Sequence, residues 1–116
     1  MMERHVVDMV RRWALLHQVD GFRFDLMGHI TMRCIQRCRR ALDDLPDGQR
    51  LLLYGEGWDF GEVQGGQRGA TAVQRNLAAS GVASFNDGLR AAVLGGSAFE
   101  DPRLQGGAWA FLCARR

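Results

Sequence analysis

Two carboxylates follow two short apolar segments of the chain. Asp25 ends the segment VDGFRFD, and Glu56 follows the segment LLLYG, 31 positions further on. That interval is about the length of one strand-helix-strand unit, whose parallel strands run roughly 4.8 Å apart. Such a unit would place both carboxylates at the carboxyl ends of neighbouring strands, where α/β enzymes keep their active sites. The spacing therefore predicts a pair of carboxylates that act together, and it does not by itself exclude a metal site.

The chemistry that fits two such groups is glycoside hydrolysis with retention, in which the carboxyl groups are about 5 to 5.5 Å apart. Asp25 would stay ionised to attack the sugar carbon, and Arg23, two residues earlier on the same strand face, would hold it charged and oriented. Glu56 would give a proton to the leaving oxygen and then act as base toward water. The alternative for Arg23 and Asp25 is an internal salt bridge that only holds the strand end.

An aromatic residue lies close to the second carboxylate, in the sequence GEGWDFG. An exposed Trp58 would offer a sugar ring an apolar face to stack on, and we assign Asp59 beside it to substrate binding as well. The alternative is a tryptophan buried in a loop core. The glycines of this segment also suggest a nucleotide-binding α/β domain, but the third glycine comes one residue late and Glu56 would push a carboxylate toward a pyrophosphate.

The elements that position these residues alternate between helix and strand. Residues 3–17 repeat apolar side chains every three or four positions, which predicts an amphipathic helix, and residues 19–25 change to the period of two that is typical of a strand. Helical spacing returns over residues 30–45 and ends at a Pro-Asp-Gly turn, before the apolar run 51–54. This order predicts a parallel α/β sheet.

The remainder of the chain has weaker patterns. A strand is expected near residues 82–85 and a helix over about 87–94, with Asn86 or Asp87 as its cap and Gly95-Gly96 as its end. Residues 106–116 have no clear period and are expected to be an atypical tail, separate from residues 1–105.

Composition indicates a folded globular protein of one small domain, because 47% of the 116 residues are hydrophobic and 24% are charged. A net charge of +2 is too small to indicate a nucleic-acid partner, and neither a membrane span nor a signal peptide is recognised. Cys34 and Cys38, four apart, are expected to be core residues in a reducing compartment, which fits a cytoplasmic or plastid-like location. No metal or other cofactor is expected.

Three blocks of the sequence resemble pullulanases and limit dextrinases, the debranching enzymes of the α-amylase superfamily (glycoside hydrolase family 13). They are DGFRFDLMGHI (20–30), LLYGEGWDFGEV (52–63) and SFNDGLRAAVLGG (84–96), and the similarity covers about residues 2–105. The resemblance implies that Asp25 is the nucleophile and Glu56 the acid/base. It also implies that Arg23 lies beside the nucleophile and that Trp58 contacts the glucan.

The resemblance further implies a partial TIM (β/α)8 barrel, comprising about strands four to six with their helices. The parent would hydrolyse α-1,6-glucosidic branch points in pullulan, starch or glycogen-derived dextrins by a retaining double displacement. The blocks that carry the family's third carboxylate and a substrate-binding Asp and His do not occur in this chain, so the remainder of the barrel is expected to be missing. The alternative is a non-catalytic remnant of the barrel, serving in glucan binding or assembly.

Overall fold

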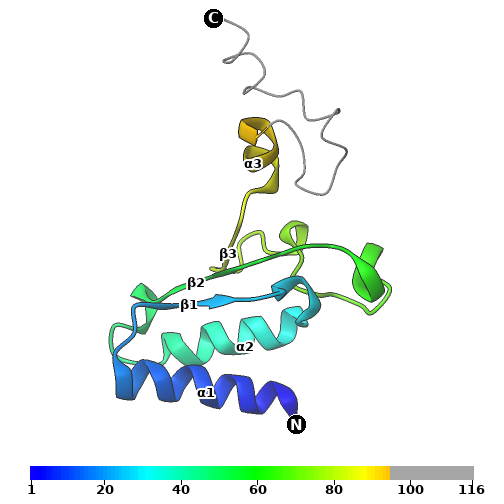
Figure 1. Ribbon diagram of the computed structural model, residues 1–116. Helices are drawn as coiled ribbons and strands as arrows, with labels where there is room; N and C mark the ends of the chain where they lie inside the picture. Colours follow the sequence, from blue (N-terminus) through cyan, green and yellow to red (C-terminus); the bar gives the residue numbers. More distant parts are fainter. Residues whose placement is uncertain (95–116) are drawn as a thin grey trace, which may run out of the picture. The chain divides into compact units, whose positions relative to one another are not determined.

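The computed structural model of the chain describes residues 1–94 (Figure 1). The chain divides into two compact units, Met1–Phe85 and Asn86–Arg116. The tail predicted at residues 106–116 lies outside the described residues.

The first unit alternates helices and strands in the predicted order. Its regular elements are α1 (Met2–His17), β1 (Gly21–Phe24), α2 (Met32–Asp43), β2 (Leu52–Gly55) and β3 (Ala83–Ser84). Short 3-10 turns connect them: η1 (Met27–His29), η2 (Gly48–Arg50), η3 (Gly61–Gly66) and η4 (Gln74–Asn76). The helices and the first two strands agree with the periodicity of the sequence, whereas the 3-10 turns were not predicted.

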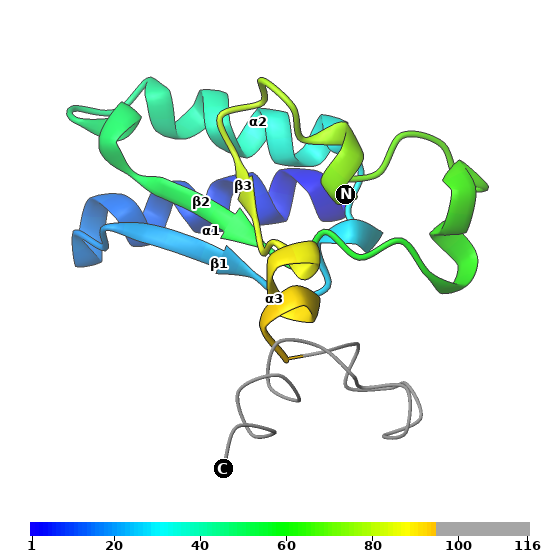
Figure 2. The same ribbon diagram turned by 90° about the horizontal axis from the view of Figure 1, so that it is seen from above.

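The three strands form one parallel sheet in the order β1-β2-β3, as Figure 2 shows from above. In the first pair, Gly21 lies opposite Leu52 and Phe24 lies opposite Gly55. The second pair is shorter and joins Tyr54 and Gly55 to Ala83 and Ser84. The prediction of parallel pairing is confirmed, and β2 is the central strand.

The prediction of a partial TIM barrel is wrong. Residues 1–85 form a small α/β domain with an open three-stranded sheet, in which β1 and β3 are the two edges and β3 has only two residues. The sequence misled because a strand-helix-strand pattern predicts which strands are neighbours and that they are parallel. The same pattern occurs in open sheets and in barrels, so it does not specify closure.

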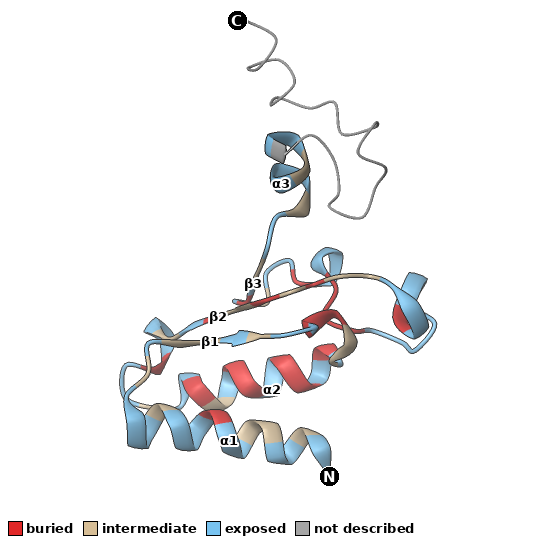
Figure 3. Ribbon diagram, viewed as in Figure 1, coloured by how far each residue is buried: buried red, intermediate tan, exposed pale blue. Residues whose placement is uncertain are grey.

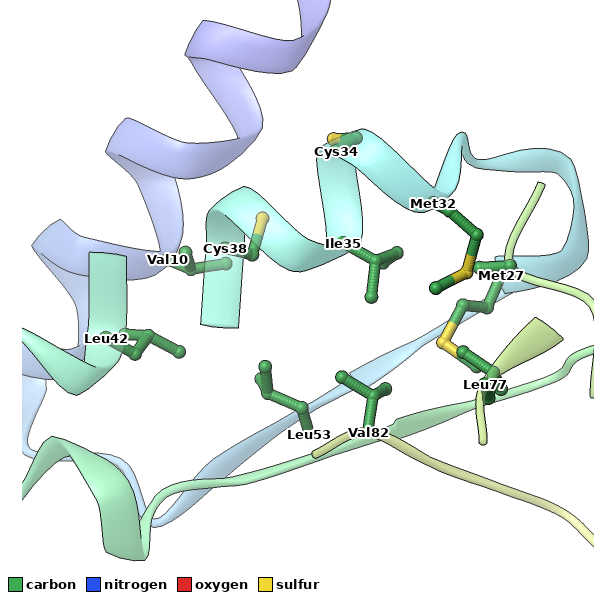
Figure 4. Close-up of a cluster of buried hydrophobic side chains, with 11 residues drawn as sticks. Val10, Met27, Met32, Cys34, Ile35, Cys38, Leu42, Leu53, Leu77 and Val82 are labelled. Atoms are coloured by element: carbon green, nitrogen blue, oxygen red, sulfur yellow. The ribbon is translucent and has the colours of Figure 1, made fainter. Parts of the chain in front are cut away.

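Both long helices cover one face of the sheet (Figure 1), and α1 packs against α2. Buried residues are more frequent along α2 than along α1 (Figure 3). Figure 4 shows Ile35 of α2 above Leu53 and Val82, and a second group, Met27 and Leu77, at the far end. The predicted core cysteines belong here: Cys34 and Cys38 are both buried and unpaired.

Glu3 connects the two helices at their N-terminal ends. Its Oε1 accepts hydrogen bonds from the Thr31 hydroxyl (3.0 Å) and from Nη2 of Arg33 (3.1 Å), and its Oε2 lies 3.6 Å from Arg37. Thr31 also caps α2, because its Oγ1 accepts from the backbone N–H of Cys34 at 3.2 Å. The hydrogen bonds from Arg33 and then Thr31 lower the pKa of Glu3.

Arg39 is buried, whereas Arg33, Arg37 and Arg40 of the same helix are exposed. Its side chain is only 11% exposed, and its guanidinium donates to the carbonyl oxygens of Gly48 and Leu51, both at 2.6 Å. Its Nε donates to Asp43 at 2.9 Å. These bonds secure the turn η2 and so fix the point at which β2 begins.

The second unit is described through α3 (Asp87–Leu94). Asn86 caps this helix as predicted, since its Oδ1 accepts from the backbone N–H of Leu89 at 2.8 Å. The predicted stop at Gly95-Gly96 lies outside the described residues.

Candidate active site

Arg23 contacts both carboxylates that the sequence singled out. Its Nη1 donates to Asp25 Oδ1 at 2.7 Å, and its Nη2 donates to Glu56 Oε1. One guanidinium therefore joins side chains from two neighbouring strand ends. This two-pronged geometry is one that lysine cannot provide.

The strand register explains why these residues meet. Phe24 and Gly55 are the last paired residues of β1 and β2, and Asp25 and Glu56 directly follow them. The N–H of Glu56 still donates to the Phe24 carbonyl at 3.2 Å, so the second carboxylate is held in line with the strands. The prediction that Asp25 and Glu56 lie at the ends of adjacent parallel strands is confirmed.

The two carboxylates differ in environment. The Glu56 side chain is 12% exposed, whereas the Asp25 side chain is 72% exposed. Glu56 also accepts from the backbone N–H of Leu26 at 3.0 Å. Leu26 has φ +44°, a left-handed conformation that is unfavourable for a branched side chain, and it turns the chain sharply between Asp25 and η1.

Two aromatic rings accompany Arg23. Phe85 lies with its ring centroid 5.8 Å from the guanidinium carbon, and it meets Tyr54 edge to face at 5.7 Å. Tyr54 is the register partner of Arg23 on β2. The hydrogen bond to Asp25 raises the pKa of Arg23, so this guanidinium stays charged.

Trp58 is half-buried, between the two alternatives that the sequence left open. Its ring centroid is 6.4 Å from that of Phe60. Its backbone is enclosed by η1: a Cβ added to Gly28 would lie 1.9 Å from the Trp58 carbonyl oxygen. Gly28 also donates from its N–H to the Glu56 carbonyl at 2.9 Å, so η1 is bound to the segment that follows β2.

Asp59 has its contacts within the loop rather than with Arg23. Its Oδ2 accepts from Nη1 of Arg75, and its Oδ1 accepts from the backbone N–H of Gly65 at 3.1 Å. The hydrogen bond from Arg75 lowers the pKa of Asp59, and the one from Gly65 adds to this. Arg75 could not be selected from the sequence, because the glycine-rich stretch before it has no period.

His29 was also missed by the sequence analysis. Its ring stacks edge to face on Phe60 with centroids 4.7 Å apart, and its Nε2 lies 3.8 Å from Glu62. Its Nδ1 is buried and has no hydrogen-bond partner among residues 1–94. A single histidine, five residues beyond the end of β1, was too weak a signal to assign a role.

Three further observations limit what the described part of the chain contains. Within residues 1–94, no three His, Cys, Asp or Glu side chains are grouped so that they could hold a metal ion. Nor does that part have a helix long and apolar enough to cross a membrane. A cleft of about 480 Å³ lies at the opposite ends of the strands, where Gln18, Asp20 and Arg50 are among its lining residues, and so it is separate from the carboxylate pair.

Comparison with known sequences identifies the class of protein. The chain is 47% identical over 112 residues to pullulanase 1, chloroplastic, of Arabidopsis thaliana, a match that covers 91% of this chain and 12% of that protein. It is 36% identical over 101 residues to the pullulanase of Klebsiella aerogenes, covering 86% of this chain and 9% of that protein. No family model matches the chain.

Solved structures agree with the sequence matches. The maltotriose complex of a PulA mutant from Klebsiella pneumoniae has a TM-score of 0.77 at 31% identity, covering 88% of this chain and 11% of that one. The pullulanase of Anoxybacillus sp. LM18-11 complexed with maltotetraose has a TM-score of 0.68 at 30% identity, covering 84% of this chain and 14% of that one.

The chain is therefore a pullulanase-type segment, related by ancestry to glycoside hydrolases. It spans about a tenth of the length of the pullulanases it matches, between 9% and 12% of the two sequence relatives described above.

Proposed function

We propose that this segment supplies the nucleophile and the acid/base of a retaining debranching glycosidase, which hydrolyses α-1,6-glucosidic bonds in pullulan, starch or glycogen-derived dextrins. The observation that supports this most strongly is the contact of one guanidinium, Arg23, with both Asp25 and Glu56. Neighbouring parallel strands run about 4.8 Å apart. That interval fits the carboxyl separation of retaining enzymes, about 5 to 5.5 Å.

The two environments suit two roles. Asp25 is open to solvent and to an approaching sugar, as a nucleophile must be, and Arg23 holds its orientation. Glu56 is largely enclosed and held by Leu26 and Arg23, which positions it as the acid/base. Trp58 would stack against a glucose ring, and Asp59 would support substrate binding from the same loop.

The partner of the site is accordingly a branched α-glucan. Relatives solved with maltotriose and maltotetraose support an α-glucan ligand. The chloroplastic relative favours a plastid location for the parent protein. The further strands and residues that a complete enzyme needs would come from sequence outside this segment.

A chimeric pullulanase tests the proposal. In it, this chain replaces the matching segment of the chloroplastic pullulanase of Arabidopsis thaliana. We expect the chimera to hydrolyse pullulan and to leave linear maltodextrin uncut. We expect Asp25→Asn to abolish hydrolysis, and Glu56→Gln to spare turnover mainly for substrates with good leaving groups. Full activity of Asp25→Asn would contradict the assignment.

A second candidate function is glucan binding without turnover, favoured by the half-buried Trp58 beside the exposed Phe60. An inactive chimera that still binds a branched glucan would support this candidate instead.

A further inference from the structure

The loop that carries Trp58 is tied down on both sides of that residue. On the C-terminal side, Asp59 uses one carboxylate oxygen for Arg75 and the other for the Gly65 N–H. On the N-terminal side, the Gly57 carbonyl accepts from the Gln74 N–H at 2.8 Å. Two consecutive residues of η4, Gln74 and Arg75, therefore hold the residues before and after Trp58.

The approach at Gly57 is close enough to require glycine. A Cβ there would lie 2.8 Å from the Gln74 nitrogen and 2.8 Å from the Ser84 hydroxyl oxygen. A third side of the Trp58 backbone is occupied by Gly28, as described above. The backbone of Trp58 is thus enclosed by η1 and held by η4. The Asp59–Arg75 pair adds a side-chain contact between η4 and the residue that follows Trp58.

The backbone around Arg75 is held by buried neighbours and by a hydrogen bond. Arg75 lies between the buried residues Val73 and Leu77, and the preceding Ala72 donates from its N–H to the Ile30 carbonyl at 2.8 Å. A charged group on such a segment can fix the position of its partner, because its own backbone is already held by packing and hydrogen bonds.

The pair is too exposed to be important for the stability of the fold. The Arg75 side chain is 52% exposed and the Asp59 side chain 26% exposed, and ion pairs at such sites contribute little to folding. Its effect should therefore be local and limited to how well the loop that carries Trp58 is ordered.

We propose that Arg75 is a positioning residue, which acts through Asp59 to fix the orientation of Trp58 toward the glucan. Asp59 then contributes to substrate binding by holding the loop, with both of its oxygens occupied by Arg75 and Gly65. The inference rests on the proposed role of Trp58 as a sugar-stacking residue.

The test uses the full 116-residue chain labelled with ¹⁵N, and the variants Arg75→Gln, Arg75→Lys and Asp59→Asn. Arg68→Gln, an exposed arginine in the preceding loop, is the matched control. Three signals are followed by NMR: the pH titration of the Gly65 amide, the indole N–H of Trp58, and the response of that indole to maltotriose.

In the unmodified chain the Gly65 amide should report Asp59 titrating below the usual pKa of 3.8, because Arg75 favours the carboxylate. In Arg75→Gln the midpoint should rise, the Trp58 indole signal should shift and broaden, and maltotriose should bind about tenfold more weakly. Asp59→Asn should abolish the titration and change the indole signal similarly. Arg75→Lys should restore part of the binding, and Arg68→Gln should match the unmodified chain.

An unchanged Gly65 titration and Trp58 signal in Arg75→Gln would overturn the inference. Unfolding of that variant would overturn it too, because a half-exposed ion pair acting only on the loop cannot carry the fold. If the unmodified chain binds no maltotriose, glucan binding by the isolated segment fails, and the Gly65 and Trp58 signals alone decide whether Arg75 positions the loop.

Discussion

Arg23 on β1 donates a hydrogen bond to Glu56, which directly follows the neighbouring parallel strand β2. The same guanidinium binds Asp25, so the two carboxylates share one cation and have a fixed relation to each other. A charged residue on a strand face is costly unless its charge is paired, and here the pairing also orients the groups proposed for catalysis.

Replacing Arg23 by lysine should reduce activity without removing the positive charge. A single ammonium group cannot bind both carboxylates in the fork geometry of Arg23, so the positions of Asp25 and Glu56 should become less defined. We expect kcat of the chimeric pullulanase to fall about a hundredfold. Steady-state kinetics on pullulan measure this, with the exposed Arg40→Lys as control. Equal kcat values for the two variants would show that Arg23 does not organise the pair.

Replacing Arg39 by methionine should destabilise the first unit. The change removes the guanidinium donor from the carbonyl oxygens of Gly48 and Leu51 and removes the bond to Asp43, which should cost about 2 to 4 kcal/mol in the free energy of unfolding. Urea denaturation of the chain measures the loss. Arg40→Met, on the exposed side of α2, should change stability by less than about 0.5 kcal/mol. Similar losses in both variants would contradict this role.

Glu3 should make the α1–α2 contact sensitive to acid. Its pKa is lowered in the folded chain, chiefly by the hydrogen bond from Arg33, so its stabilising effect is fully present above the usual value of 4.5. That effect is lost as the pH falls through the lower folded-state pKa. The difference in unfolding free energy between the unmodified chain and Glu3→Gln should therefore be constant near neutral pH and shrink in acid.

The exposed Asp8→Asn, on the same helix, is the control for the Glu3 experiment. Its stability difference from the unmodified chain should be small at every pH, because the Asp8–Arg4 pair is largely exposed to solvent. A Glu3→Gln difference that grows in acid would have the wrong sign for the predicted stabilising effect of the Glu3 carboxylate.

Cys38 should be inert toward thiol reagents in the folded chain. Burial raises its pKa to about 12, so almost no thiolate is present at pH 8, and the sulfur is also inaccessible. Cys113 is the third cysteine of the sequence, and its replacement by alanine leaves Cys34 and Cys38 as the thiols that can react. In this variant, disulfide-exchange reagents should modify Cys34 and Cys38 only at the rate at which the chain unfolds. Rapid labelling of Cys38 without loss of structure would show that the buried face of α2 is accessible to solvent.

The sequence predicted the parts of the molecule that have a regular period. Strand alternation in FRFD and the continuous apolar run before Glu56 located β1 and β2, and their 31-residue offset is the observed register. Alternate residues of a strand share a face, which placed Arg23 beside Asp25, and the offset placed Glu56 at the end of the neighbouring strand. Barrel closure could not be inferred correctly, because the same local pattern also forms an open sheet.

The loops of the site could not be predicted for a different reason. The left-handed turn at Leu26 and the burial of Arg39 depend on contacts with residues distant in sequence. The Asp59–Arg75 pair spans a glycine-rich stretch whose conformation is set by η1 and η4 rather than by any repeat. Residue type indicated the chemistry near Glu56, but tertiary packing determined which side chains contact the site residues.

The most direct test of the central claim is the anomeric configuration of the first product released by the chimeric pullulanase. Proton NMR during the first minutes of pullulan hydrolysis distinguishes the two anomers before they equilibrate. A nucleophilic Asp25 with Glu56 as acid/base predicts the α-anomer, because two displacements retain the configuration of the bond that is cleaved. Initial release of the β-anomer would mean a single displacement by water, and it would remove Asp25 from the nucleophile's role.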